Sequence, residues 1–326
     1  MPTLDDAPAI AATATALLDT PPACLSFAPE DHTLLVVGTY SLHEATESAP
    51  SARTGTLELY RASGGTLAHV ASHATPGGAV LDLKFSPHTP ALLAVALSRG
   101  VVALYRLCGE ELEATATIAV AAPDVLVLSL TWATAAEGVL GATLSDGSVA
   151  VVDVGAQAVT SAHTPHTLEA WTCEFARDGR TLYSGGDDAA LVRWDLGAGV
   201  EVGRSRRGAH GAGVTSILDL GEGEVWSGSY DDVLRVWDVR GRVMKCEDEV
   251  GLGGGVWRLQ EMGDTGRVLA SCMHAGARVV EKKGLGIVAK WEENESMNYG
   301  GHVHKDVPNV VASCSFYDKK LCVWSI

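Results

Sequence analysis

The stretch from Ala209 to Arg240, AHGAGVTSILDLGEGEVWSGSYDDVLRVWDVR, decides the fold of this chain. Two runs in it alternate between apolar and polar residues, Val214 to Leu220 and Glu224 to Ser229, and a third run ends on Trp237-Asp238. Such alternation with a period of two is typical of half-buried β-strands. A tight turn at 230–232, Tyr-Asp-Asp, joins the second run to the third. A unit of this kind that closes on Trp-Asp indicates a WD-repeat blade, one four-stranded sheet of a β-propeller.

Four side chains of this blade are expected to form one hydrogen-bonded chain: His210, Ser227, Asp231 and Trp237. The aspartate precedes the tryptophan by six residues, and the same spacing joins Asp188 to Trp194 and Asp318 to Trp324. Ser184 stands in the serine position of the earlier blade, whereas Cys314 replaces the serine before Asp318. These residues are therefore interpreted as structural rather than chemical.

The length of 326 residues fits seven blades of about 40–45 residues each. The chain ends on a third strand, Leu321 to Ile326, so Thr13 to Asp19 is expected to supply the missing fourth strand of the last blade. Residues 1–12 are expected to be flexible, and the polar insert SLHEATESAPSART, residues 41–54, is expected to be a mobile loop. The sequence thus predicts an all-β, seven-bladed WD-repeat propeller that occupies residues 13–326 as one domain.

The composition excludes several classes of function. A net charge of −16 disfavours nucleic-acid binding and suits a basic or cationic partner. Seven scattered cysteines without a C-x-x-C motif predict neither disulfides nor zinc, and no P-loop, dinucleotide fingerprint or metal-ligand set is present. Because the chain also has no apolar run of membrane-spanning length and no signal peptide at its start, we expect a cytoplasmic monomer without cofactor or metal.

Blade six departs from the repeat. His274 stands where the turn aspartate belongs, while Val280 replaces the tryptophan and Ala270 the serine. His274 is therefore free to serve another purpose. The blade opens with three glycines, Gly253, Gly254 and Gly255, whose backbone can approach a ligand closely and present N–H groups to an anion. A flexible turn with a tolerated histidine is the alternative interpretation.

The segment WEENESMNYGG, residues 291–301, is unusually polar for the entry to a strand. Since loops that enter first strands and turns between second and third strands share one face of a propeller, Glu295, Ser296 and Tyr299 could reach the same end of the channel as His274. A solvated acidic loop is the alternative.

An aromatic and acidic mouth is predicted at this end of the channel. The residue before each turn aspartate, or before His274, is expected to look out from that face; these residues are Asp187, Tyr230, Tyr317 and Met273. Two tryptophans in nearby loops, Trp171 and Trp257, are expected to join them. Such a mouth suits a quaternary ammonium group, which the faces of aromatic rings attract.

Segments of the last four blades together resemble one family. They are GGDDAALVRWD (185–195), AHGAGVTSI (209–217), SGSYDDVLRVWDVR (227–240), LGGGVWR (252–258), CMHAG (272–276), ENESMNYG (293–300) and CSFYDKKLCVW (314–324). In this order they resemble the diphthine methyl ester hydrolases, called diphthine methyltransferases in older naming, which are WD-repeat proteins of diphthamide biosynthesis. The family typically has a histidine where Asn294 stands. The resemblance implies removal of a methyl ester from methylated diphthine on translation elongation factor 2.

The resemblance also suggests roles. Ester hydrolysis needs an activated water or nucleophile, a base and oxyanion donors, and no G-x-S-x-G elbow is present. His274 is expected to act as the base that activates water, with Glu295 orienting it. The glycine N–H groups or Tyr299 would hold the oxyanion, and Trp257, Arg258 and Ser296 would contact the substrate. A non-catalytic scaffold, in trafficking or in recruiting a ubiquitin ligase, is the competing hypothesis.

Overall fold

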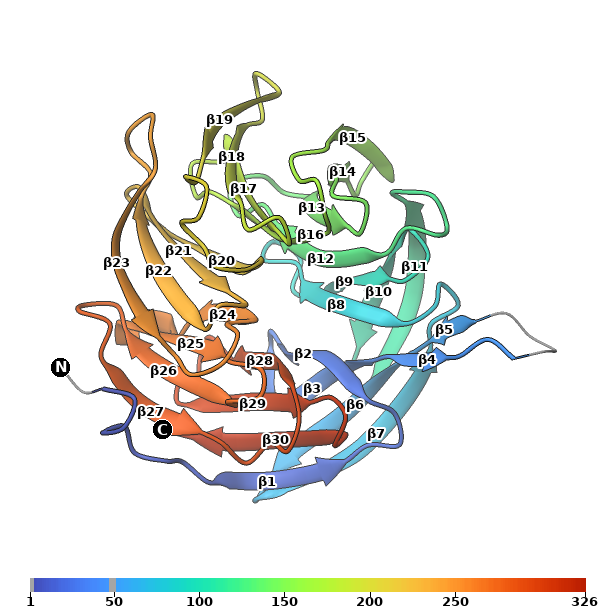
Figure 1. Ribbon diagram of the computed structural model, residues 1–326. Coiled ribbons are helices and arrows are strands. Elements are labelled where there is room, and N and C mark those ends of the chain that lie inside the picture. Colours follow the sequence, from blue (N-terminus) through green and yellow to red (C-terminus); the bar gives the residue numbers. More distant parts are fainter. Residues whose placement is uncertain (1–2, 47–50) are drawn as a thin grey trace.

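The innermost strands of seven antiparallel sheets contact one another in a closed ring around a central channel (Figure 1). The computed structural model describes residues 3–46 and 51–326, and within them each of the seven sheets has four strands. Each innermost strand touches the innermost strand of the next blade, and β28 of blade seven returns to β2 of blade one. The seven-bladed propeller predicted from the sequence is confirmed.

The blades follow one another along the chain. Blade one contains β2 (Pro22–Ala28), β3 (Asp31–Thr39), β6 (Thr56–Ser63) and β7 (Thr66–Ala74). Blade two contains β8 (Val80–Phe85), β9 (Leu92–Leu97), β10 (Val101–Cys108) and β11 (Glu111–Ala119). Blade three contains β12 (Val127–Trp132), β13 (Val139–Leu144), β14 (Val149–Asp153) and β15 (Ala158–His163). Blade four contains β16 (Ala170–Phe175), β17 (Thr181–Gly186), β18 (Leu191–Asp195) and β19 (Val200–Arg204).

The last three blades repeat the pattern. Blade five contains β20 (Val214–Gly221), β21 (Glu224–Ser229), β22 (Val233–Asp238) and β23 (Lys245–Gly251). Blade six contains β24 (Arg258–Glu261), β25 (Arg267–Ser271), β26 (Ala277–Glu281) and β27 (Ile287–Trp291), with a 3₁₀ turn at Gly263–Thr265. Blade seven contains β28 (Asn298–Val303), β29 (Val310–Ser315), β30 (Lys320–Ser325) and β1 (Ala12–Leu17).

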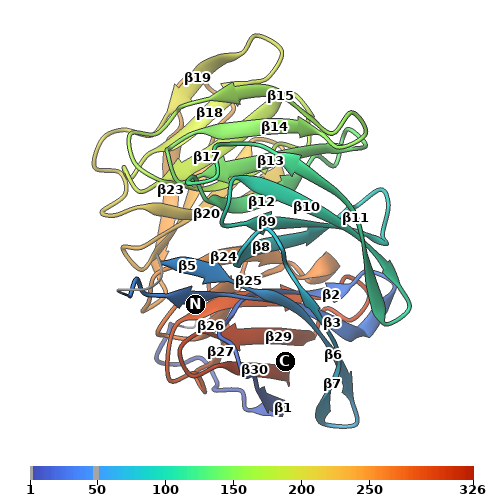
Figure 2. The same ribbon diagram turned by 90° about the vertical axis from the view of Figure 1, so that its right-hand side faces the viewer.

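The N-terminal strand closes the ring, as predicted. β1 pairs antiparallel with β30, and the two strands lie side by side in both views (Figures 1 and 2). The stretch before β1, which the sequence led us to expect as flexible, differs from that expectation where it is described. The N–H of Ile10 donates to the carbonyl of Lys290 at 2.7 Å, the N–H of Lys290 donates to the carbonyl of Pro8, and Ala7 is buried. The segment thus extends blade six along β27.

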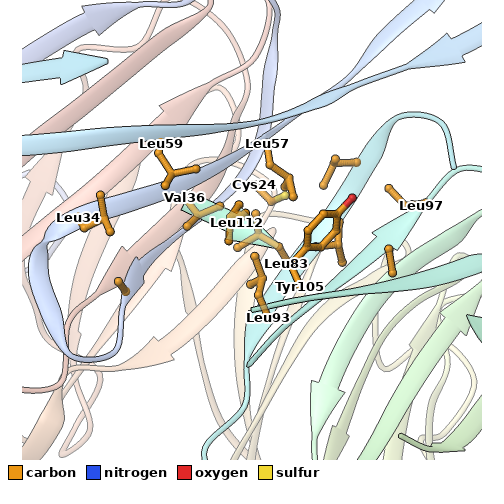
Figure 3. Close-up of a cluster of buried hydrophobic side chains, with 14 residues drawn as sticks. Cys24, Leu34, Val36, Leu57, Leu59, Leu83, Leu93, Leu97, Tyr105 and Leu112 are labelled. Atoms are coloured by element: carbon orange, nitrogen blue, oxygen red, sulfur yellow. The ribbon is translucent and has the colours of Figure 1, made fainter. Parts of the chain in front are cut away.

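The core lies between the blades rather than inside one of them, because each blade packs both of its faces against neighbours. Figure 3 shows one such layer, where Leu57 and Leu59 of blade one meet Leu83, Leu93 and Tyr105 of blade two. All five side chains are buried. This packing on two faces buries most residues of the middle strands, and it fixes the loops at each end of the channel.

The structural network of blade five forms around Ser227. Its hydroxyl lies 2.9 Å from Nε2 of His210 and accepts a hydrogen bond from Nε1 of Trp237 at 2.8 Å. Asp231 does not join this chain directly. Its carboxylate accepts from the N–H of Gly211 at 2.6 Å and pairs with Arg235 at 2.8 Å. The aspartate therefore clamps the turn, while the serine holds the tryptophan.

Two other blades vary this network. In blade four, His166 completes it, with Nδ1 2.9 Å from Asp188 and Nε2 2.9 Å from the hydroxyl of Ser184. In blade seven, Ser313 and not Cys314 occupies the serine position, since Nε1 of Trp324 donates to the hydroxyl of Ser313 at 3.0 Å. Between the serine and the turn aspartate, blade seven therefore has one residue more than blades four and five.

Candidate active site

One end of the channel opens into a cavity of about 690 Å³. Its walls come from blades one to seven and are mostly aromatic or aliphatic: Pro21, Ala23, Tyr40, Ser41, Leu42, His43, Leu81, Leu126, Leu128, Trp171, Tyr230, Trp257, Tyr299, Phe316 and Tyr317. Loops that enter innermost strands and turns between second and third strands both contribute, so the two kinds of loop share one face, as the sequence predicted. We call this space the mouth cavity.

β-Bulges direct five of these side chains into the mouth cavity. On the innermost strands of blades one, two, three, four and seven, the pairing with the next strand skips one residue, and the skipped residues are Ala23, Leu81, Leu128, Trp171 and Tyr299. A bulge bends its strand and re-aims the extra side chain, which is why bulges are frequent beside functional sites. Each of the five skipped residues lines the mouth cavity.

Trp257 is the centre of the aromatic cluster. The centroid of its ring system lies 5.5 Å from that of Trp171, 5.8 Å from that of Tyr230 and 5.0 Å from that of Tyr299. Nε1 of Trp171 donates a hydrogen bond to the carboxylate of Asp187 at 3.1 Å, which fixes that indole and brings an exposed negative charge to the rim. In the predicted aromatic and acidic mouth, three rings therefore contact Trp257, and one of them, Trp171, is hydrogen-bonded to Asp187.

A second row of rings continues from Tyr299. Phe316 lies 5.6 Å from Tyr299, 4.9 Å from Tyr317 and 6.1 Å from Tyr40, measured between ring centroids. Sequence reasoning missed Phe316 and Tyr40. Phe316 is the additional residue in the longer turn of blade seven, so counting back from Trp324 to Ser313 would have revealed it.

The insert of blade one also reaches the mouth cavity. It forms a hairpin beside the ring, β4 (Ser41–His43) and β5 (Ala52–Thr54), where a mobile loop was expected (Figure 1). Residues 47–50, which belong to the same insert, lie outside the described residues. Leu42 and His43 line the cavity. Nε2 of His43 lies 2.8 Å from the hydroxyl of Thr54 on the paired strand, which orients the imidazole.

Two phenols of the mouth, Tyr230 and Tyr299, remain neutral near pH 7. Burial, followed by the nearby Asp187 carboxylate, raises the pKa of Tyr230 above its usual range. Burial likewise raises the pKa of Tyr299 to about 12. Yet the rim is open to solvent, because Tyr230 is 40% and Tyr317 is 70% exposed. The site thus offers neutral aromatic faces beside a carboxylate, in reach of a large partner.

The glycine run of blade six packs against protein. A Cβ atom on Gly254 would lie 2.3 Å from the carbonyl oxygen of Cys272, and one on Gly255 would lie 2.7 Å from the sulfur of Met273. Gly253 has a φ of +80°, which favours glycine. The expectation that Met273 looks out from the face is wrong. It is 3% exposed, has a φ of 44° and pairs in a bridge with Asn298, so the turn folds inward beneath Gly255.

The structure brings His274 close to both predicted loops through its backbone. Its turn contacts the glycine run, and the side-chain amide of Asn294 donates to the carbonyls of Met273 and His274 at 3.2 and 3.3 Å. The imidazole itself is exposed. Glu295 points elsewhere: its side chain is 81% exposed and lies 3.5 Å from Nζ of Lys320.

Ser296 supports the rim. Its hydroxyl accepts a hydrogen bond from the N–H of Tyr317 at 3.0 Å and so holds the turn that carries Phe316 and Tyr317. Neither Ser296 nor His274 nor Glu295 lines the mouth cavity, whereas Tyr299 does. The predicted residues therefore separate into an aromatic group that meets in the cavity and a polar group outside it.

Arg258 lies below the mouth. Its guanidinium pairs with the buried carboxylate of Asp82 at 3.2 Å and lies 3.4 Å from the hydroxyl of Ser129. Arg258 and Asp82 line a smaller cavity of about 220 Å³ inside the channel, together with Cys24, Leu25, Lys84, Gln260, Gly300, Gly301 and His302. We call this space the lower cavity.

Other kinds of site are not found in the part of the chain that the structure describes. No three His, Cys, Asp or Glu side chains there are placed to hold a metal ion. All seven cysteines are free thiols. The described residues also include no helix with the length and apolar character needed to cross a membrane.

These observations define a WD-repeat β-propeller whose channel opens into an aromatic cavity with an acidic rim. No protein-family model matches the chain. It is 38% identical over 303 residues to a diphthine methyltransferase of Schizosaccharomyces pombe, and the matched region covers 89% of this chain and 90% of the relative. It is 27% identical to a diphthine methyltransferase of Saccharomyces cerevisiae, over 94% of this chain and 96% of the relative. The chain therefore belongs to the diphthine methyltransferase family.

A solved structure agrees on the fold. One chain in a crystal structure of the mitotic checkpoint complex superposes with a TM-score of 0.75, covering 95% of this chain and 91% of that chain. The two sequences are 17% identical, so the likeness shows a common propeller and nothing about the site.

Proposed function

We propose that this chain hydrolyses the methyl ester of methylated diphthine on translation elongation factor 2, as a step of diphthamide biosynthesis. Two relatives that match 89% and 94% of this chain are named diphthine methyltransferase. The observation that carries the proposal is the mouth cavity, where Trp257 contacts three other aromatic rings beside the carboxylate of Asp187.

The mouth cavity suits the charge of this substrate. Methylated diphthine has a trimethylammonium group beside its ester. A quaternary ammonium cannot donate hydrogen bonds, so aromatic faces and a nearby carboxylate are what can bind it. Each favourable cation–ring contact is worth about 0.5–2 kcal/mol. The rings of Trp171, Tyr230 and Tyr299 each contact the ring system of Trp257, so a small cation bound beside Trp257 would have several rings close to it.

The open rim and the overall charge suit a protein substrate. Leu42, Tyr230 and Tyr317 are all at least 40% exposed around the cavity. The modified histidine of the factor would enter between them. The net charge of −16 would attract a partner with a basic surface. We propose that the chain does this as a cytoplasmic monomer, without metal or cofactor.

Hydrolysis needs a base for the attacking water. The base must lie within hydrogen-bond reach of that water. Among the histidines, His43 lines the mouth cavity, and when its Nε2–H donates to Thr54 the other ring nitrogen, Nδ1, carries the lone pair that a base needs. The geometry therefore favours His43 over His274, whose imidazole lies outside the cavity wall. The role predicted for His274 and Glu295 from the sequence stays a prediction that the same assay can test.

The test uses purified protein and elongation factor 2 that carries methylated diphthine, in water labelled with heavy oxygen. Hydrolysis at the acyl carbon removes one methyl group, releases methanol and leaves one labelled oxygen in the carboxylate, all visible by mass spectrometry. Methyl loss without the label would show transfer of the methyl group to another acceptor. Tight binding without methyl loss would favour the non-catalytic scaffold. Either result would refute the proposed hydrolase.

A further inference from the structure

The lower cavity and the mouth cavity are lined by residues that are adjacent along the chain. On three innermost strands and at the start of a fourth, consecutive residues line first one space and then the other: Ala23 and Cys24, Leu81 and Asp82, Tyr299 and Gly300, and Trp257 and Arg258. The upper member of each pair is apolar or aromatic. The lower members include a carboxylate and a guanidinium. A group that enters between the rings would therefore meet charged side chains one residue further down.

Most polar groups of the lower cavity are already satisfied by the protein. The carboxylate of Asp82 accepts hydrogen bonds from the N–H groups of Leu83 and Leu130, accepts one from the hydroxyl of Ser129 and pairs with Arg258. The amide of Gln260 is engaged at both ends by the backbone of Val303.

His302 is also committed. Its Nδ1 accepts a hydrogen bond from the N–H of Phe27 at 3.2 Å, so the ring hydrogen sits on Nε2, 3.3 Å from the hydroxyl of Ser26. Burial, with the nearby charge of Lys84, lowers the pKa of His302 to about 3. This imidazole is therefore neutral and has no free lone pair for a ligand.

Lys84 differs from these satisfied polar groups of the lower cavity. Its side chain lines the lower cavity from β8 of blade two, and within residues 3–46 and 51–326 its ammonium takes part in no ion pair and no hydrogen bond. Its charge nevertheless affects the pKa values of Cys24 in blade one, Glu174 in blade four and His302 in blade seven. Because the charge of Lys84 acts on groups in three different blades, its ammonium lies in the channel that these blades surround.

The nearby acids leave this cation without a committed counterion. Asp82 is held by Arg258 and three further donors. Glu174 accepts a hydrogen bond from Thr131, and its burial raises its pKa to about 7, so near neutral pH its carboxyl is partly uncharged. Arg258, for its part, has guanidinium donors beyond those facing Asp82 and Ser129.

We propose that the lower cavity is an anion site in which Lys84, assisted by Arg258, binds the carboxylate that ester hydrolysis produces. The inference rests on the proposed function for the identity of its ligand, a carboxylate attached to the carbon that bears the trimethylammonium. In the reaction, water adds to the ester carbonyl, the bond from carbon to the methoxy oxygen breaks, and methanol leaves. The carboxylate and one proton remain. The two cations would stabilise the negative charge that develops on the carbonyl oxygen and persists in the product.

Small probes separate the two cavities. Trimethylglycine carries an ammonium and a carboxylate, its methyl ester carries only the ammonium, and tetramethylammonium tests the mouth cavity alone. Binding is measured through the fluorescence of the mouth tryptophans. The wild-type protein is expected to bind trimethylglycine about tenfold or more tightly than its methyl ester, because a charge-assisted hydrogen bond to a carboxylate is worth that much. Lys84→Met should abolish this preference and leave the affinity for tetramethylammonium unchanged.

Matched variants make the result specific. Lys84→Arg should keep the preference, Glu174→Gln should keep or enlarge it, and Lys245→Met on the exposed face of β23 should change nothing. Lys84→Gln replaces the Met variant if the latter melts at a lower temperature than the wild type. Equal binding of trimethylglycine and its ester to the wild type, or a preference that survives loss of Lys84, would overturn the anion site. Methyl release from elongation factor 2, measured separately, shows whether the proposed function stands or fails independently.

Discussion

Replacing Trp257 is the most direct test of the mouth cavity. This indole contacts the rings of Trp171, Tyr230 and Tyr299 with centroid separations of 5.0–5.8 Å, so it both faces the cavity and holds its neighbours in place. Trp257→Ala would remove one cation–ring contact, worth up to about 2 kcal/mol in a half-buried site, and would leave the neighbouring rings without a common support. We expect kcat/KM for the modified elongation factor to fall by about thirtyfold.

The assay compares methyl release with folding. Trp257→Ala should bind tetramethylammonium more weakly by a similar factor, while its melting temperature stays close to that of the wild type, because Trp257 is only partly buried. Trp257→Phe keeps an aromatic face and should recover most of the loss. If Trp257→Ala releases the methyl group within threefold of the wild-type rate, the ammonium is not bound in the mouth cavity. A Phe variant as impaired as the Ala variant would instead show that the indole acts through its shape.

Three further predictions concern other parts of the molecule. His43→Ala should lower kcat by about 10²–10⁴-fold, the usual contribution of a positioned base, whereas His274→Ala should stay within a few-fold; the reverse order would restore the assignment made from the sequence. Asp231→Ala and Trp237→Phe should each lower the free energy of unfolding by about 1–3 kcal/mol in denaturant titrations and spare turnover in the folded protein, and loss of turnover at unchanged stability would contradict their structural role. Burial lowers the pKa of His210 from 6.5 to about 4. The neutral imidazole therefore stabilises the fold above pH 6.5, and this contribution is lost as the pH falls towards 4. A melting temperature that does not fall between pH 6.5 and pH 4 would refute this prediction.

The fold could be predicted from the sequence because its signals are local. Strands alternate with period two, and the six-residue spacing from Asp231 to Trp237 recurs at Asp188 and at Asp318. Even the closing role of β1 followed from counting strands. The errors arose where a turn changes length. Blade seven has one additional residue before Asp318, so Ser313 rather than Cys314 bonds to the tryptophan, and Phe316 enters the mouth cavity.

The candidate site was only partly predictable, because proximity across blades leaves no trace in a linear pattern. Trp171, Tyr230, Trp257 and Tyr317 were expected at one mouth from the rule that their loops share a face, and the cavity contains them all. The inward position of Met273 was not predictable from the sequence. It depends on Gly255 having no side chain, because a Cβ atom there would lie 2.7 Å from the sulfur of Met273. The hairpin that carries His43 looked like a loop, because its strands are three residues long and polar.

The β-bulges explain how a common propeller acquires two cavities of opposite character. Three of the five bulges expose one residue to the mouth cavity and the next residue to the lower cavity: Ala23 and Cys24, Leu81 and Asp82, and Tyr299 and Gly300. Neighbouring residues of a strand are about 3.3 Å apart, a step comparable to the separation of two groups attached to one carbon. Methylated diphthine has its ammonium and its ester on one carbon. Rings at one level and Lys84 and Arg258 just below would therefore bind both groups at once, which neither cavity could do alone.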